Sequence, residues 1–410
     1  MVSNYVCTYV PIFSPEHFVI YLLFFRLAQS EVPHESLCHS DTIQTLIRYL
    51  CWTRKPSKRA GRILLRLSKN LYCLMPIVNQ RIMSWLKPEI ASRPTMKDPP
   101  CQECQDLEDL SKELSQNFSL LAETGYAEGV MCHKLVKGEI DDKRNVSVSA
   151  TLLVRPRKLL LNILINHEGL DVLLDIIEKF PGENESRIFA DATYSLSNLS
   201  GHLGIVAPNL TIEESTLSCV CRFEENKDPK NLKIKTDDGK FIEVNRDKLC
   251  NASSVFEAML SGQFAESSQN EIQLPMTGFS AIVCLIHHLY GCQWCPVISN
   301  MSVQVLLELT SLTDKYLLVD FNRVVSAEIV RRCQKPDQVV QIYEASLQNE
   351  YPVGGTKDNL NVCATSYLLV GDVEPEVRAE VFRQLMKSNM ASDFLDDVNR
   401  IVREKLMQPI

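Results

Sequence analysis

The sequence predicts a mostly α-helical protein that contains one compact α+β domain in its second half. Three observations lead to this fold class. Apolar residues recur at helical spacing through most of residues 40–200, short β-branched segments alternate with helices between residues 215 and 335, and helical patterning alone returns from residue 336. The length of 410 residues suits two or three domains of ordinary size.

The first half repeats a unit of two helices separated by a short break. Asp41–Trp52 and Ser57–Leu71 form one such pair, and Glu168–Phe180 and Ser186–Ser200 form another. Each segment gathers its apolar residues on one helical face. The two pairs end on similar sequences, LSKN in the first and LSNL in the second. Repetition of helical units is typical of a solenoid.

The second pair carries two more specific patterns, GLDVLL from Gly169 and YSLSNL from Tyr194. These residues resemble the two helix signatures of an armadillo repeat, G-x-x-x-L-x-x-L-L and W-A-L-x-N-L. Tyr194 stands where the family usually has Trp, and Ser195 stands where it has Ala. The resemblance implies a partial, degenerate armadillo-like α-solenoid over residues 1–207. An unclassified helical bundle is the alternative that the pattern leaves open.

The most specific pattern lies between residues 233 and 291. Two short strands flank the turn Asp237-Asp238-Gly239, and S-x-x-F-x-x-M from Ser253 and E-I-x-L-P from Glu271 follow them. This segment resembles BTB/POZ domains, which implies an α+β domain over residues 215–335 that pairs with a second copy of itself. Asn245 departs from the family pattern, which has a His at this position.

The loop Phe264-Ala265-Glu266 carries the functional part of this resemblance. BTB adaptors that recruit cullin-3 have a hydrophobic-x-Glu element in this loop, so the resemblance implies that Phe264 fills a cullin pocket and that Glu266 fixes the register. The alternative is that Phe264 packs into its own domain and that Glu266 is a solvated loop charge. Residues 336–410 resemble the BACK-like helices that follow such domains and extend the cullin contact.

A basic segment interrupts a chain whose formal net charge is −8, because ten basic residues and no acidic residue lie between Asp41 and Glu89. Four of them recur at helical spacing. The last helix of an armadillo repeat lines the groove, so the resemblance implies a groove for an acidic or phosphorylated protein substrate. The candidate groove residues are Arg59, Arg62, Arg66, Lys69, Tyr194 and Asn198. A solvated helix face explains the stripe equally well, and nucleic acid is disfavoured because aromatic residues are not interleaved.

The fifteen cysteines are scattered through apolar segments, so we expect mostly reduced, buried thiols in a cytoplasmic or nuclear protein, without a cofactor. Cys101-x-x-Cys104 has the spacing for a zinc site with Cys132 and His133, although neighbouring Cys and His rarely bind one ion. Cys292-x-x-Cys295 has no second pair nearby. We therefore predict ordinary thiols and no metal at either place.

Three further classes of protein are disfavoured by the sequence. Apolar runs stay shorter than 18 residues, so no membrane span is expected. The apolar run His17–Phe25 lacks a preceding positive charge, which favours a solenoid helix over a signal peptide. G-x-S-x-G, P-loop, G-x-G-x-x-G and H-E-x-x-H motifs are absent, so we predict an adaptor rather than an enzyme.

Together these features resemble adaptor proteins that combine armadillo repeats with a BTB/POZ domain. The resemblance implies the substrate-recognition subunit of a cullin-3 ubiquitin ligase. In that arrangement the solenoid binds a protein substrate, and the BTB domain binds cullin-3 and dimerises. A BTB scaffold with a transcriptional or cytoskeletal role is the alternative.

Overall fold

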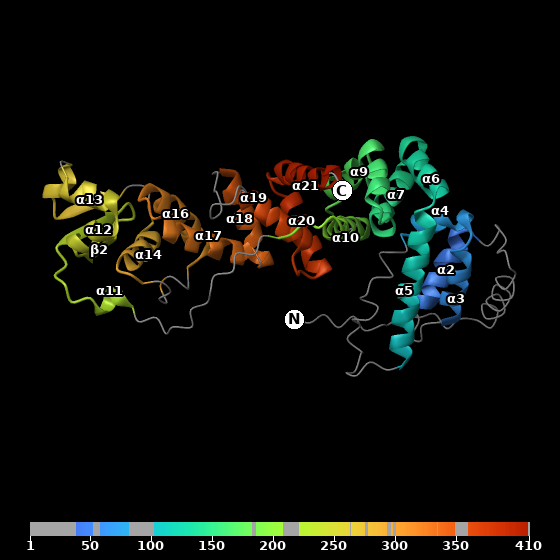
Figure 1. Ribbon diagram of the computed structural model, residues 1–410, viewed down its shortest axis with the longest axis horizontal. Coiled ribbons are helices and arrows are strands. Elements are labelled where there is room, and N and C mark those ends of the chain that lie inside the picture. Colours follow the sequence, from blue (N-terminus) through green and yellow to red (C-terminus); the bar gives the residue numbers. More distant parts are fainter. Residues whose placement is uncertain are drawn as a thin grey trace. The chain divides into compact units, whose positions relative to one another are not determined.

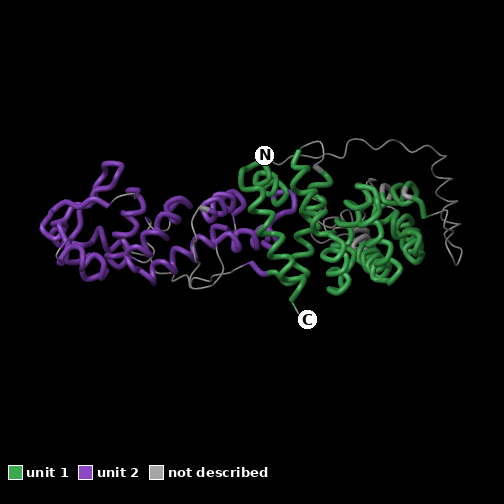
Figure 2. The backbone as a smooth tube through the Cα atoms, turned by 90° about the horizontal axis from the view of Figure 1, so that it is seen from above, with its two compact units in different colours: residues 1–205, 378–410 green, residues 206–377 purple. Residues whose placement is uncertain are grey.

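The computed structural model describes residues 38–51, 58–81, 102–182, 186–207, 221–262, 264–274, 278–292, 297, 301–333, 335–348 and 360–408. Within these ranges the chain forms two compact units, residues 1–205 with 378–410 and residues 206–377 (Figure 2). The apolar run His17–Phe25 and Cys101 lie outside the described residues. The predicted fold class is confirmed, because helices dominate throughout and one small sheet lies in the second unit (Figure 1). The predicted domain boundaries stay a prediction.

The first unit is helical. Its elements are α2 (Ser40–Cys51), α3 (Lys58–Leu67), η2 (Leu71–Cys73), α4 (Leu74–Asn79), α5 (Gln102–Ala122), α6 (Gly125–Lys137), α7 (Ile140–Leu153), α8 (Arg157–Leu161), η5 (Asn162–Asn166), α9 (Gly169–Lys179), α10 (Ser186–His202), most of α20 (Pro375–Met386) and α21 (Ala391–Met407). Pro156 separates α7 from α8, because proline cannot donate the hydrogen bond that a continuous helix needs.

Helix α7 lies at the centre of this unit and packs against α4, α5, α6, α9 and α10. Its residues 146–153 are all buried, and most of them are small. Small side chains let neighbouring helices approach closely, but they bring hydroxyl groups into the core. The Ser149 Oγ donates to the Val78 carbonyl at 3.1 Å, and the Ser195 Oγ of α10 donates to the Val148 carbonyl at 3.0 Å. Both of these buried hydroxyls therefore have a hydrogen-bond acceptor, which offsets the cost of their burial.

The last helix of the chain packs against the predicted solenoid. Helix α21 contacts α8 and α9, and it lies beside α9 in Figure 1. The Arg403 Nη2 donates to both carboxylate oxygens of Asp171, at 2.7 and 2.8 Å. The rings of Phe382 on α20 and Phe394 on α21 meet edge to face at 5.1 Å. Residues 378–410 therefore add a helical layer to the first unit, although they follow the α+β segment in sequence.

The thiols of the described residues agree in part with the sequence-based expectation. Seven described cysteines are reduced thiols, and five of these are buried. Cys38 and Cys73, in contrast, form a disulfide bond. Their Cα atoms lie 4.8 Å apart, because the packing of α2 against α4 brings together residues that are 35 positions apart. This pair is an exception to the expected mostly reduced thiols.

The second unit combines a three-stranded sheet with helices. Its elements are α11 (Arg222–Glu225), β1 (Leu232–Thr236), β2 (Phe241–Val244), α12 (Arg246–Ala252), α13 (Ser254–Ser261), η7 (Ala265–Ser268), β3 (Glu271–Leu274), α14 (Phe279–Leu289), α16 (Val303–Lys315), α17 (Val319–Cys333), α18 (Pro336–Gln348) and α19 (Leu360–Val370). Among the described residues no helix is long and apolar enough to span a membrane.

The central strand β1 pairs antiparallel with β2 and parallel with β3. Gly239 makes the hairpin turn with a φ of 78°, which glycine adopts without steric cost. The register aligns Ile234 with Ile242 and with Ile272, so one row of buried isoleucines crosses all three strands. This apolar face forms one side of the core of the α+β segment.

Two ring pairs extend this core. Phe256 of α13 stacks on Tyr316 at 4.5 Å, and His288 of α14 stacks on Phe321 of α17 at 3.9 Å. Burial raises the pKa of the Tyr316 hydroxyl to about 12 and lowers the pKa of the His288 imidazole. Both side chains are therefore neutral near pH 7, as a packed aromatic core requires.

A buried carboxylate fixes α17. The Glu328 side chain accepts hydrogen bonds from Arg331 at 2.6 Å and from Arg332 at 2.7 Å, and Arg332 also donates to the Met301 carbonyl at 3.2 Å. Burial acts to raise the pKa of Glu328, but the two arginines outweigh it and hold this pKa below its ordinary value.

We expect Glu328→Gln to lower the free energy of unfolding by about 2–3 kcal/mol, because it leaves two arginines without their carboxylate. The folded-state pKa is lowered, so this stabilisation is fully present above the pKa of an unfolded glutamate and is lost as the pH falls. Denaturant titrations measure the free energy of unfolding at neutral and acidic pH. The difference in this free energy between wild type and Glu328→Gln should be smaller in acid. Glu257→Gln, at an exposed position, serves as a control. An equal loss of free energy of unfolding in both variants would contradict the stabilising role of the Glu328 ion pairs.

Candidate functional site

The loop predicted to bind a partner follows α13. The Ser253 Oγ caps the start of this helix by accepting from the Phe256 N–H at 3.4 Å. The helix ends at Gly262, where a Cβ would collide with the Ala258 carbonyl oxygen. After this position the chain forms the short turn η7, in which the Phe264 carbonyl accepts from the Ser267 N–H at 3.1 Å.

The guanidinium of Arg246 holds this loop in place. Its Nη1 donates to the Leu260 carbonyl at 3.0 Å and to the Ser267 carbonyl at 3.1 Å, and it lies 3.4 Å from the Glu266 carbonyl. Its Nη2 donates to the Gln269 carbonyl. Charge-assisted bonds of this kind are about twice as strong as neutral ones. One side chain thus fixes both the end of α13 and the turn that follows it.

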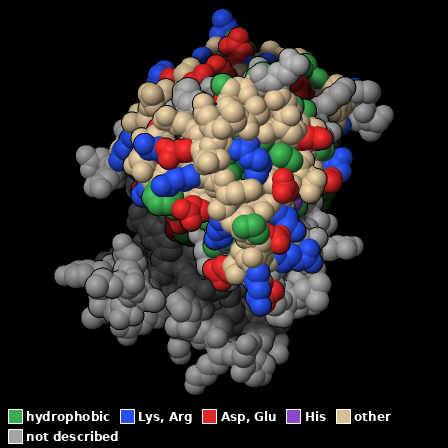
Figure 3. Space-filling view, turned by 90° about the vertical axis from the view of Figure 1, so that its left-hand side faces the viewer, with side chains coloured by type: hydrophobic (Ala, Val, Ile, Leu, Met, Phe, Trp, Pro, Cys, Tyr) green, Lys and Arg blue, Asp and Glu red, His purple; other side chains and the backbone are tan. Residues whose placement is uncertain are grey.

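Within this fixed loop the Phe264 ring points outward. Its side chain is 60 % exposed, Ala265 is exposed, and Glu266 is half-buried. On the face that carries α12 and α13, hydrophobic side chains form small groups among interspersed basic and acidic ones (Figure 3). An interaction at such a surface depends on single apolar anchors more than on a broad apolar patch. Exposed aromatic rings such as Phe264 are candidates for this role.

Asn245, which departs from the BTB/POZ pattern, makes hydrogen bonds through both its side chain and its backbone. Its Oδ1 caps α12 by accepting from the Lys248 N–H at 3.0 Å, and its Nδ2 donates to the Pro229 carbonyl at 2.9 Å. Its backbone N–H donates to the Tyr290 hydroxyl at 2.6 Å. Burial raises the pKa of this tyrosine. Asparagine is a preferred capping residue, so the departure from the family pattern costs no hydrogen bond here.

The predicted basic stripe lies on one exposed face of α3 and the turn after it. Its four members, all exposed, are Arg59, Arg62, Arg66 and Lys69. The opposite face of α3 carries Ile63 and Leu64, which are buried. Helix α3 packs against α2 and α5. The four basic residues therefore share one exposed face of α3 and the turn after it.

The other two groove candidates lie on a different helix. Tyr194 and Asn198 are half-buried on α10, which packs against α7 and α9. The Asn198 Oδ1 accepts from the Arg155 guanidinium at 3.4 Å. The nearby Ser197 accepts from Arg378 of α20. The two sets of candidates thus have different packing neighbours, and a single groove through both stays a prediction.

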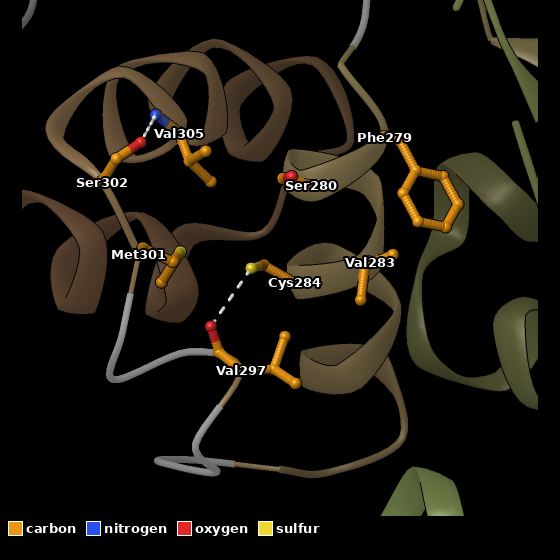
Figure 4. Close-up of a pocket in the computed structure, with 8 residues that line it drawn as sticks. All are labelled: Phe279, Ser280, Val283, Cys284, Val297, Met301, Ser302 and Val305. Carbon is orange, nitrogen blue, oxygen red and sulfur yellow. Dashed lines mark hydrogen bonds between the residues drawn. The ribbon is translucent and has the colours of Figure 1, made fainter.

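A cavity of about 320 Å³ lies between α14 and α16 (Figure 4). The described residues that line it are Phe279, Ser280, Val283, Cys284, Val297, Met301, Ser302 and Val305. The Cys284 Sγ lies 3.6 Å from the Val297 carbonyl, and Ser302 caps α16. The described lining residues are mainly apolar, and none of them is Asp, Glu, Lys, Arg or His.

The zinc site considered for Cys101 and Cys104 lies outside the described residues, which include neither Cys101 nor the Cys104 side chain. Cys132 is buried on α6, and burial raises the pKa of its thiol. The adjacent His133 is exposed. The two neighbours thus lie on different sides of their helix.

Comparison with known proteins indicates which class of protein this chain resembles. The BTB/POZ domain model matches residues 222–323, so this α+β segment is a BTB/POZ domain, a module of protein–protein interaction and dimerisation. The chain is also similar to Armadillo repeat-containing protein 5 of Mus musculus, with 27 % identity over 290 residues that cover 67 % of this chain and 31 % of the relative. The chain thus spans about a third of that relative's length. No solved structure matches it significantly.

These similarities confirm the sequence-based resemblance to armadillo-plus-BTB/POZ proteins, and they support a protein-interaction adaptor. Sequence reasoning had singled out the exposed Phe264 but missed Arg246. The carbonyls that Arg246 binds lie 14 to 23 residues away, so no short motif marks its role.

We expect Arg246→Ala to loosen residues 264–269 without unfolding the BTB domain, because the carbonyls lose a common donor. Hydrogen–deuterium exchange should accelerate in this loop by about tenfold, as expected for the loss of roughly 1.5 kcal/mol. Lys248→Ala removes another cation of α12, whose ion pair with Asp228 is exposed, and should leave the loop unchanged. Equal protection of the loop in wild type and Arg246→Ala would contradict the proposed role.

Proposed function

We propose that this chain is the substrate-recognition subunit of a cullin-3 ubiquitin ligase in the cytoplasm or nucleus. The BTB domain binds cullin-3 and a second copy of the chain, and the armadillo-like helices bind a protein substrate. The exposed Phe264 ring on the loop that Arg246 holds is the observation that carries this proposal.

The geometry of the loop suits an apolar anchor. The ring of Phe264 is 60 % exposed, so burial in a partner's pocket removes a large apolar area from water. Burying such a ring contributes about 1.5–3 kcal/mol. Because Arg246 already orders the backbone, association does not have to supply the entropy cost of ordering the loop.

Glu266 complements this anchor. It lies two residues after Phe264 in the same turn, and its side chain is half-buried. Arg246 binds its backbone carbonyl and leaves the carboxylate to interact with a cation or an N–H group of a partner. A charge in a fixed position contributes more to register and specificity than to raw affinity.

The substrate contact is assigned to the basic stripe of α3. Four exposed cations along one helix face attract acidic or phosphorylated segments, and arginine binds carboxylates and phosphates with two parallel hydrogen bonds. Dimerisation through the BTB domain gives the dimer two basic stripes, one on each copy of the chain. A substrate with two acidic segments then gains from a raised effective concentration.

We expect Phe264→Ala to weaken binding of cullin-3 by about tenfold to a hundredfold, which corresponds to the loss of 1.5–3 kcal/mol. Glu266→Lys should weaken it further by reversing the charge at the contact. Isothermal titration of the full chain with the purified amino-terminal domain of cullin-3 measures both effects.

Phe241→Ala is the matched control, because Phe241 is also a half-exposed phenylalanine of the BTB domain, but lies on β2 away from the loop. Phe241→Ala should bind cullin-3 with the affinity of wild type. Absence of binding by the wild-type chain would remove the ligase function and leave a BTB scaffold of another kind. Equal affinity of wild type and Phe264→Ala would refute the anchor.

Charge reversal tests the substrate surface separately. The double variant Arg59→Glu, Arg62→Glu should lose most of its co-purifying acidic substrates in proximity labelling, while cullin-3 binding stays unchanged. Lys137→Glu, Lys158→Glu makes the same change in charge at exposed positions of other helices and should keep these substrates. Loss of the same proteins from both variants would point to net charge rather than to the stripe.

A further inference from the structure

Three sulfur and nitrogen ligand atoms converge at one end of the BTB domain. They belong to Cys221, His287 and Cys292, and all of them lie within 4.8 Å of one another. The Cys221 Sγ is 3.4 Å from the His287 Nδ1. The sequence alone had indicated an ordinary thiol at Cys292. Neither the armadillo-like helices nor the cullin loop uses these residues.

The end of α14 brings His287 and Cys292 together. Gly291 adopts a φ of 85° just after the helix, its N–H donates to the His288 carbonyl at 2.7 Å, and the Cys292 N–H donates to the His287 carbonyl at 3.0 Å. This pair of bonds is the Schellman motif, in which the second residue past the helix end folds back on the last turn. The backbone therefore fixes the spacing of these two ligands.

Helix α11 supplies the third ligand. Cys221 is the residue before this helix, and its carbonyl accepts from the Glu224 and Glu225 N–H groups at 3.1 Å. Phe223 packs its ring against the rings of His287 at 4.8 Å and Tyr290 at 4.9 Å. This aromatic contact holds α11 against α14 and directs Cys221 toward the imidazole.

The environment favours metal ligation. His287 and Cys292 are 3 % and 1 % exposed, and Cys221 is half-buried. Burial lowers the pKa of His287 against the opposing effect of Glu224, so the imidazole is neutral at pH 7, as a ligand must be. Arg222 lies against Gly291 and adds a positive charge nearby. Two thiolates that bind a divalent cation form a neutral centre, which limits the cost of a buried charge.

We propose that Cys221, His287 and Cys292 bind a zinc ion that joins α11 to the end of α14. In a tetrahedral site, zinc–sulfur and zinc–nitrogen bonds of about 2.3 and 2.0–2.1 Å place sulfur and nitrogen about 3.5 Å apart, close to the separation of Cys221 and His287. Thiolate and imidazole ligands favour zinc over magnesium or calcium. Binding releases two thiol protons, and the fourth position of the tetrahedron takes one further donor atom.

Zinc and cobalt binding by the full-length chain, purified under reducing conditions, tests this site. We expect about one zinc ion per chain from these three ligands, and Co²⁺ in its place should show thiolate-to-metal charge-transfer absorption. Cys221→Ser and Cys292→Ser should each lower zinc content by about one ion and abolish this absorption. Cys250→Ser is the matched control, because Cys250 is another half-buried free thiol of the same domain, and it should keep the metal.

Two results would overturn the proposal. One is a folded Cys221→Ser chain, checked by circular dichroism, that retains all the zinc and the cobalt absorption of wild type. This variant changes a half-buried residue and carries the test if Cys292→Ser does not fold. The other is wild-type protein that takes up no zinc in excess metal, as would follow if mass spectrometry finds Cys221 and Cys292 joined as a disulfide under reducing conditions.

Discussion

The guanidinium of Arg246 links three parts of the BTB domain that are distant in sequence: the start of α12, the end of α13 and the turn η7. The backbone carbonyls that it binds are part-buried or exposed, so Arg246 stabilises the loop mainly by offering one charge-assisted donor group to several of them at once. The outward position of Phe264 depends on this constraint. A flexible loop would allow the ring to fold back onto its own domain, whereas a fixed turn keeps it available.

A second constraint operates inside the helical unit. The buried segment of α7 consists largely of small residues, so neighbouring helices approach it closely, and hydroxyl groups such as that of Ser149 find carbonyl partners on other helices. Residues 378–410 also belong to this unit, since α21 packs against α8 and α9, and Arg403 forms an ion pair with Asp171. They therefore cover part of the surface of the neighbouring helices, as adjacent layers do in helical repeat proteins.

The end of α14 has both a structural and a chemical consequence. The Schellman motif at Gly291 satisfies the last carbonyls of the helix and at the same time sets Cys292 beside His287. The Tyr290 hydroxyl accepts from the backbone N–H of Asn245, the cap of α12. Packing, capping and two of the three proposed metal ligands therefore meet within residues 287–292 at the end of this helix. A site of this kind is built by backbone hydrogen bonds, which position its side chains before any ligand binds.

The sequence by itself determined the helical class, the hairpin at Gly239 and the BTB/POZ domain, because these depend on local periodicity and on turn residues. It placed the helices α2, α9 and α10 within about two residues of their observed ends. Only the tertiary structure decided the role of Arg246, the return of α21 to the first unit, the Cys38–Cys73 disulfide and the approach of Cys221 to His287. Each of these joins residues far apart in the chain. Such contacts follow from how whole helices and strands pack, and local sequence patterns do not determine that packing.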